Sequence, residues 1–219
     1  MKIKGLILDF DGTMATPSTL DFKRLNDEFA LCLAALGVTW PGEGYLLERI
    51  QGLQTGLLPL WGPDKTNGLI AKIRQRIVDS EVEAAQASQL FSFTPQVLEE
   101  ARQVGLQVAI VSRNCAPAIL SVFADAEDYN LLSRERVASV KPDPTHFMAA
   151  AQRMEVAIDA CVAAGDHIMD MQAARAAHCL GVGVLSGLNS AQDLKQHGAN
   201  IVVDNIAHLL EALRGRGFL

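Results

Sequence analysis

The chain has 219 residues, of which 49% are hydrophobic and 20% are charged, so it can bury a sizeable core and a second, smaller one. Its net charge of −6 comes without a block of like charges. This pattern excludes an electrostatic surface for nucleic acid or for an anionic membrane. A negatively charged ligand must therefore be bound by a few local groups.

Residues 5–8 form an apolar run that ends at Asp9 and Asp11, and this pattern predicts a buried strand followed by a polar loop. The run is far shorter than the roughly 20 apolar residues of a membrane span. No small-residue cleavage site follows it, as a secretory leader would require. We therefore expect a cytoplasmic protein that binds no membrane.

Residues 16–90 contain no strand pattern. A helical pattern closes at Gly37, and a stretch rich in glycine and proline runs from Trp40 to Gly68. The predicted helices of this segment lie at residues 19–36, 46–50 and 67–87. We interpret the segment as an α-helical cap domain, inserted into an α/β core domain that comprises residues 1–15 and 91–219.

The rest of the chain alternates between apolar runs and helical patterns. Its predicted strands lie at residues 106–111, 160–164, 182–185 and 201–203, with a weaker candidate at 129–132. Its predicted helices lie at residues 94–105, 144–154 and 168–178. Such alternation is typical of an α/β fold, in which helices cover both faces of a mostly parallel sheet. Ligands of these sheets bind at the carboxyl ends of the strands.

Paired carboxylates follow two of the predicted strands. Asp9 and Asp11 have the chemistry of a nucleophile or metal ligand and of a general acid and base, although an Asp-Gly turn would also explain them. Asp166 and Asp170 stand four residues apart where a later strand meets a helix. This pair suits Mg²⁺, but it would also serve to cap the helix.

A hydroxyl residue and a lysine are two further candidates. Ser112 comes directly after the strand predicted at 106–111, where it can bind a phosphate oxygen at a helix start or simply cap that helix. Lys141 precedes Pro142 and Pro144, which stiffen the backbone around this single cation. A lone lysine is more often a solvated surface charge.

In this order, the four clusters resemble the motifs of the haloacid dehalogenase superfamily of phosphohydrolases. The resemblance rests on Asp9-Phe10-Asp11-Gly12-Thr13, Ser112, Lys141 and Gly165-Asp166 with Asp170. It implies a three-layer α/β/α Rossmann-like parallel sheet, with the insertion as the family's small α-helical cap. One departure concerns the second motif, because Arg113 stands where the family usually has Asn or Gly directly after the hydroxyl residue.

The resemblance implies a role for each matched residue. Asp9 is the implied nucleophile, which forms an aspartyl phosphate, and Asp11 is the implied general acid and base. Ser112 and Lys141 complete the implied catalytic set and hold the phosphoryl oxygens. The implied substrate-binding residues are Gly12, Thr13, Ser112, Arg113, Asn114 and Lys141. The implied Mg²⁺ ligands are Asp9, Asp11 through its backbone carbonyl, Asp166, and Asp170 through water or as a support of Lys141.

These roles favour a Mg²⁺-dependent phosphatase that hydrolyses a small phosphorylated metabolite. A phosphomutase of the β-phosphoglucomutase kind is the main alternative, but such enzymes use a cap histidine and residues 1–145 contain none. A dehalogenase, a phosphonatase and a catalytically silent binding protein fit the motifs less well. We expect His146, His178, His197 and His208 at helix surfaces or caps. The sequence leaves open the substrate, the oligomeric state and the roles of Arg113, Arg49, Gln51 and Lys65.

Overall fold

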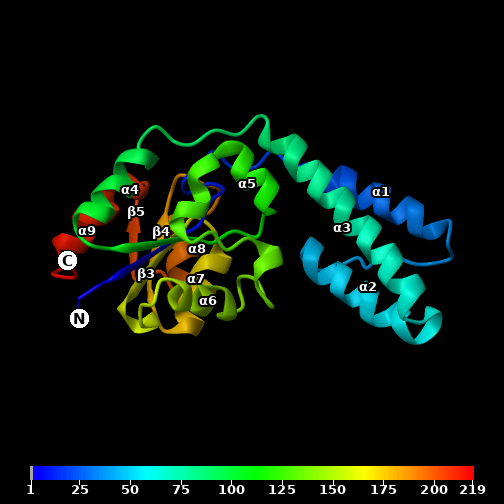
Figure 1. Cartoon of the computed structure of the whole chain (residues 1–219). Helices are drawn as coiled ribbons and strands as arrows, with labels where there is room; N and C mark the ends of the chain where they lie inside the picture. The colour runs from blue at the N-terminus through cyan, green and yellow to red at the C-terminus, as the bar shows by residue number, and fades with distance from the viewer. Residues whose placement is uncertain (1) are drawn as a thin grey trace. The chain divides into compact units, whose positions relative to one another are not determined.

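The computed structural model describes residues 2–219. Five parallel strands form one sheet in the order β2-β1-β3-β4-β5. Figure 1 shows this sheet together with the helices that accompany it. The strands are β1 (Gly5–Leu8), β2 (Gln107–Ile110), β3 (Cys161–Gly165), β4 (Leu180–Val184) and β5 (Ile201–Val203). The helices that accompany the sheet are α4 (Thr94–Gln103), α5 (Ala116–Val122), α6 (Thr145–Arg153), α7 (Ile168–Ala177), α8 (Ala191–Gln196) and α9 (Leu209–Arg214). The predicted α/β class is confirmed.

Each face of the sheet is buried under its own helices. Successive residues of a strand point to opposite faces. In β1, Leu6 and Leu8 therefore belong to one apolar cluster with residues of α4, α5 and α9, and Ile7 belongs to another with residues of α6 and α7. Burial on both faces explains why the strands are short, continuous apolar runs instead of alternating patterns.

The prediction of a weak strand at residues 129–132 is wrong. A 3₁₀ helix, η1 (Ala124–Tyr129), ends there, and Asn130 has a φ of 49°, which interrupts an extended chain. Only Leu132 pairs with the sheet, through an isolated bridge to Val111. The N–H of Leu132 donates to the carbonyl of Ile110 at 2.8 Å, so this residue lies alongside the end of β2.

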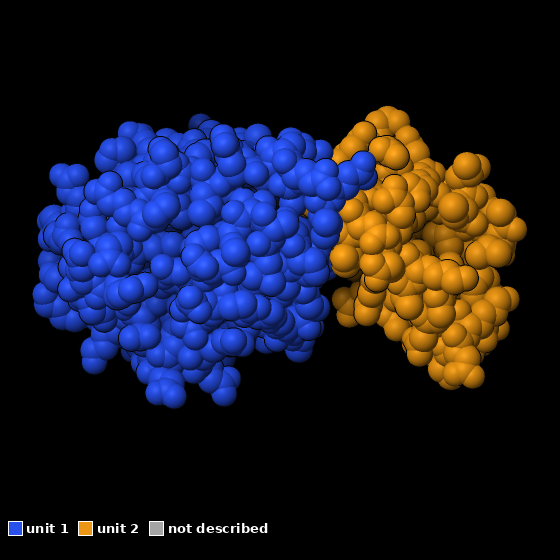
Figure 2. Space-filling view, turned by 45° about the horizontal axis from the view of Figure 1, so that its top comes forward, with its two compact units in different colours: residues 1–19, 82–219 blue, residues 20–81 orange. Residues whose placement is uncertain are grey.

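The chain divides into two compact units, residues up to 19 with 82–219, and residues 20–81 (Figure 2). Residues 16–19 and 82–90, which the sequence analysis placed in the insertion, belong to the first unit. Two hydrogen bonds hold the connecting segments beside each other: the N–H of Thr16 donates to the carbonyl of Gln89 at 2.9 Å, and the N–H of Phe91 to that of Met14 at 3.0 Å. The connections are therefore part of the sheet-containing unit.

The second unit is helical and has its own core. Its helices are α1 (Phe22–Ala34), α2 (Leu46–Trp61) and the greater part of α3 (Pro63–Ala85). The buried hydrophobic residues of this core are Leu25, Phe29, Leu33, Trp40, Ile50, Leu53, Leu57, Ile70, Ile73 and Ile77. Within residues 2–219, no helix is long and apolar enough to cross a membrane.

The helix predicted at residues 46–50 is much longer in the structure. It continues to Trp61 as α2, and α3 already begins at Pro63. Glycine and proline in this stretch predicted a loop because they destabilise helix interiors. However, Leu53 and Leu57 continue the buried stripe that Ile50 begins, so tertiary packing outweighs local preference.

Replacing a core leucine of the helical unit should destabilise that unit. Leu33 is 1% exposed, whereas Leu31 on the same helix is 76% exposed. We expect Leu33→Ala to lower the free energy of unfolding by about 2–5 kcal/mol, and Leu31→Ala to change it by less than about 0.5 kcal/mol. Both tryptophans, Trp40 and Trp61, belong to this unit, so urea titration followed by tryptophan fluorescence reports its unfolding. Equal midpoints for the two variants would contradict the packing described above.

Candidate active site

A tight turn ends β1 and presents Asp9 at the carboxyl edge of the sheet. The carbonyl of Phe10 accepts hydrogen bonds from the N–H groups of Thr13, Met14 and Ala15 at 3.3, 2.9 and 3.0 Å. Gly12 has a φ of 78°, a backbone conformation that favours glycine. The turn fixes the direction in which the chain leaves the strand, and the side chain of Asp9 is left almost fully buried.

Lys141 brings a buried cation to Asp9. Its Nζ lies 2.5 Å from Asp9 Oδ1 and 2.6 Å from Asp170 Oδ1, and it donates to the carbonyl of Val111 at 3.2 Å. Burial alone would lower the pKa of Lys141, but the carboxylates of Asp170 and Asp9 raise it above its usual range. Lys141 therefore stays protonated, and it joins the end of β1 to the start of α7.

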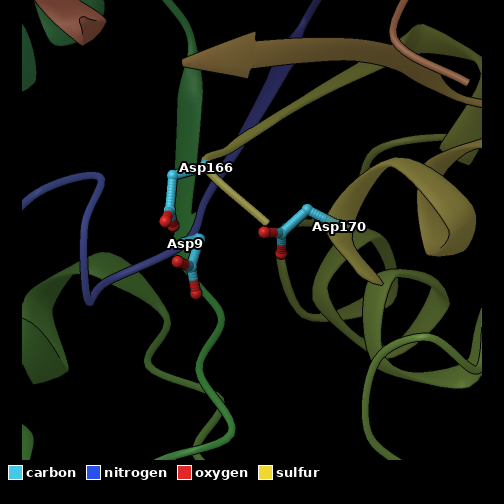
Figure 3. Close-up of side chains that lie close together, drawn as sticks. All are labelled: Asp9, Asp166 and Asp170. Carbon is cyan, nitrogen blue, oxygen red and sulfur yellow. The ribbon is translucent and has the colours of Figure 1, made fainter. Parts of the chain in front are cut away.

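Asp166, directly after β3, completes a cluster of three carboxylates (Figure 3). Oxygen atoms of Asp9, Asp166 and Asp170 all lie within 4.8 Å of one another. The hydroxyl of Thr13 donates to Asp166 Oδ1 at 3.4 Å. Burial, together with the negative charge of Asp170, raises the pKa of Asp166 to about 6. Burial also raises the pKa of Asp9 well above its usual value, although Lys141 opposes this.

The donor set of this cluster fits a divalent cation. Within residues 2–219, the salt bridges of these three buried carboxylates are with one ammonium only, that of Lys141, so the ionised cluster keeps two uncompensated negative charges. Hard cations such as Mg²⁺ bind carboxylate oxygens of this kind, with water and phosphate oxygens as further ligands. One such ion would balance the charge of the cluster.

The loop after β4 packs directly on Asp166, and the sequence analysis missed it. A Cβ atom at Gly187 would lie 1.7 Å from Asp166 Oδ2, so only glycine leaves room for this carboxylate. The N–H of Leu188 donates to Asp166 Oδ2 at 3.4 Å, and the hydroxyl of Ser186 donates to the carbonyl of Gly12 at 2.7 Å. The available signal was a polar, glycine-containing segment after a fourth parallel strand, at the same edge as the others.

The segment after β2 reaches Asp11. The buried hydroxyl oxygen of Ser112 accepts from the N–H of Asn114 at 3.0 Å, and the side-chain amide of Asn114 donates to Asp11 Oδ2 at 3.3 Å. Burial raises the pKa of Asp11, and the hydrogen bond from Asn114 partly offsets this. The Arg113 guanidinium donates to the backbone carbonyl of Lys141.

The structure brings the predicted residues of the core to one edge of the sheet. Asp9, Lys141 and Asp170 are in direct contact, and Asp166 lies beside them. Asp11 lies outside the carboxylate cluster and is linked to the segment after β2 instead. The three residues whose roles the sequence left open belong to the second unit: the Arg49 guanidinium is 4.6 Å from the Trp40 ring, Lys65 Nζ is 4.0 Å from the Trp61 ring, and Gln51 is exposed.

A sequence profile of the haloacid dehalogenase-like hydrolases matches residues 3–178. The chain belongs to this family. It is 26% identical over 234 aligned positions to the phosphoglycolate phosphatase of Shigella dysenteriae serotype 1 (strain Sd197), with 96% of this chain and 92% of the relative covered. It is 24% identical over 233 positions to the phosphoglycolate phosphatase of Escherichia coli (strain K12), with the same coverage.

Solved structures with the same fold align over nearly the whole chain. A hydrolase from Pseudomonas syringae aligns with a TM-score of 0.69 at 24% identity, covering 97% of this chain and 98% of the other. A putative β-phosphoglucomutase from Thermotoga maritima aligns with a TM-score of 0.60 at 19% identity, covering 97% and 99%. At these identities the structures support the fold of this hydrolase alone.

In this haloacid dehalogenase-like hydrolase, Asp166→Asn should stabilise the metal-free protein. The pKa of Asp166, about 6, lies above the usual 3.8, so the folded state binds this proton more tightly than the unfolded chain does. The contribution of Asp166 to stability therefore falls as the pH rises from about 4 to above about 6.

We expect Asp166→Asn to raise the free energy of unfolding by on the order of 1–3 kcal/mol near pH 7.5 in a chelator, and by much less near pH 4. Urea denaturation followed by circular dichroism measures this. Asp128→Asn, at an exposed position, is the control and should change the value by less than about 0.5 kcal/mol at either pH. A destabilised Asp166→Asn near pH 7.5 would show that burial does not dominate the energetics of this carboxylate.

Proposed function

We propose that this hydrolase is a Mg²⁺-dependent phosphatase that acts on a small phosphorylated metabolite through an aspartyl-phosphate intermediate. The observation that carries the proposal is the buried carboxylate of Asp9, which Lys141 contacts at 2.5 Å within the cluster that includes Asp166. A carboxylate whose position is fixed by a protonated amine is suited to nucleophilic attack. The positive charge of Lys141 also offsets the negative charge of an anionic substrate.

Asp9 and Asp11 divide the chemistry between them. In the first step, a carboxylate oxygen of Asp9 bonds to phosphorus, the bond from phosphorus to the leaving oxygen breaks, and Asp11 gives that oxygen a proton. The raised pKa of Asp11 supports this role, because it increases the protonated fraction that an acid needs. In the second step, water attacks phosphorus, ionised Asp11 takes its proton, and the bond to Asp9 breaks to release phosphate.

Ser112 and Lys141 are the proposed ligands of the phosphoryl oxygens. Both side chains are buried at the carboxyl edge, where water cannot replace their contacts. The further proposed substrate contacts are Gly12, Thr13, Arg113 and Asn114, on the segments that follow β1 and β2. These segments meet through the hydrogen bond between Asn114 and Asp11, which supports a single binding site.

Asp9, Asp166 and the backbone carbonyl of Asp11 are the proposed ligands of Mg²⁺. Asp170 would act through water, because its two oxygens already accept from Lys141 and from the N–H of His167, at 2.6 and 3.1 Å. When bound, Mg²⁺ would supply positive charge to the carboxylates and to the phosphoryl group. The surplus negative charge of the cluster supports this assignment.

Phosphoglycolate is the first substrate to test, because relatives named phosphoglycolate phosphatase align with 96% of this chain. The experiment is a panel of phosphate monoesters that includes phosphoglycolate and p-nitrophenyl phosphate, with Mg²⁺ or with a chelator. We expect phosphate release from at least one compound with Mg²⁺ and none in chelator. Asp9→Asn should lose at least about 10³-fold in kcat and form no phosphoenzyme. Full activity in Asp9→Asn would place the nucleophile elsewhere, and an inactive parent would overturn the proposal.

Asp11→Asn should separate the two steps. An alkyl phosphate needs a proton on its leaving oxygen, whereas p-nitrophenolate leaves without one. We expect the first step to slow by about 10²- to 10⁴-fold with an alkyl phosphate and much less with p-nitrophenyl phosphate. Since water attack is slowed for both, rapid mixing should show a burst of nitrophenol and then stalled phosphoenzyme. An equal loss in the first step with both compounds would mean that another group supplies the proton.

A further inference from the structure

His146 is a buried polar residue for which the proposed reaction has no use. It lies in the first turn of α6 and is 0% exposed, although the sequence suggested a helix surface or a cap. Both ring nitrogens have a backbone partner. Nδ1 lies 3.4 Å from the backbone nitrogen of Lys141, and Nε2 lies 3.0 Å from the carbonyl oxygen of Leu132. The ring thus joins two segments that are distant in the sequence.

Burial keeps the ring of His146 neutral, and its two backbone partners fix the tautomer. Burial lowers the pKa of His146 to about 3, and the charges of Lys141 and Arg113 act in the same direction. The imidazole is therefore neutral, with Nδ1 accepting from the N–H of Lys141 and the hydrogen on Nε2 donating to Leu132. A ring held in this way has no proton to exchange with a substrate, so it acts through its hydrogen bonds alone.

These hydrogen bonds lead to both proposed phosphoryl ligands. The carbonyl of Leu132 that His146 contacts also accepts from the N–H of Ser112, at 3.1 Å. The other bond holds the N–H of Lys141, and the Arg113 guanidinium donates to the carbonyl of the same residue. Side chains thus hold both the N–H and the carbonyl of Lys141. One of them, His146, is also linked to Ser112 through the carbonyl of Leu132.

We propose that His146 is a positioning residue, which holds the backbone of Lys141 so that the side chain of Lys141 binds the same phosphoryl group as Ser112. This inference rests on the proposed phosphatase function. Without the ring, the buried N–H of Lys141 loses its acceptor, and the backbone is free to turn toward another one. A displacement of the order of 1 Å at Nζ is enough to lower the rate strongly.

Three substitutions separate positioning from folding. His146→Leu removes both hydrogen bonds at similar volume. His146→Asn places its carboxamide near the position of Nδ1 and can accept from Lys141, whereas His146→Gln reaches the position of Nε2 and can donate to Leu132. We expect kcat with p-nitrophenyl phosphate and saturating Mg²⁺ to fall by about 10- to 100-fold in His146→Leu and His146→Gln. His146→Asn should recover most of the parent kcat.

Stability provides the matched control. Met154→Ala removes a buried side chain at the other end of α6 and should lower the urea midpoint without changing kcat at a temperature where all variants are folded. Folded variants of His146 that all keep kcat within about twofold of the parent would overturn the inference. So would a His146→Gln that regains activity as fully as His146→Asn, because the bond to Lys141 would then not matter.

Lys141→Met distinguishes failure of this inference from failure of the proposed function. An active parent, an inactive Lys141→Met and an unaffected His146→Leu would overturn the role of His146 alone. If the parent hydrolyses no phosphate monoester, or if Lys141→Met keeps full activity, the function assigned to Lys141 fails and the role of His146 fails with it.

Discussion

The ammonium of Lys141 lies in the protein interior between the carboxylates of Asp9 and Asp170, at 2.5 and 2.6 Å. A buried ion without a partner costs several kcal/mol, so each of these charges depends on the others. The three residues come from the end of β1, from the segment before α6 and from the first turn of α7. This ion pair therefore determines how closely the three segments meet. With Lys141 counted, the three ionised carboxylates still carry two uncompensated negative charges, and the cluster is therefore suited to a divalent cation.

The backbone can approach the carboxylates of Asp166 and Asp170 this closely only at glycines, which have no side chain. A Cβ at Gly165 would lie 2.3 Å from Asp170 Cγ, and one at Gly12 would lie 2.6 Å from Asp166 Oδ2. Gly187 is tighter still, since it faces the same Asp166 carboxylate from the loop after β4. The carboxylates gain hydrogen bonds from these loops because the backbone can come so near. Gly165 at the end of β3 and Gly12 and Gly187 in the loops after β1 and β4 thus serve the same purpose, which is to surround carboxylates with protein and exclude water.

The sequence indicated members of the candidate site where those residues directly follow strands. Asp9, Ser112 and Asp166 each come one or two positions after an apolar run, and parallel strands place their carboxyl ends at one edge. Lys141 follows no strand, and its place in the set came only from the resemblance of the ordered motifs. His146 gave no signal at all, because its partners are backbone groups, and any residue type supplies those. The same limit applies to Gly187, whose importance depends on a carboxylate that is distant in the sequence.

The sequence by itself determined the α/β class, the five strands of the sheet and the chemistry of the residues that follow them, because apolar runs and polar breaks are local patterns. It did not determine the length of α2, since Leu53 and Leu57 are buried only when α1 and α3 pack against them. It also did not determine the coil around Leu132, whose single bridge to Val111 depends on the neighbouring strand. Tertiary structure alone decided which charges meet, how their pKa values shift and which backbone groups hold Lys141. The physical reason is that burial and electrostatic contact depend on distances between segments, and no pattern along the chain contains those distances.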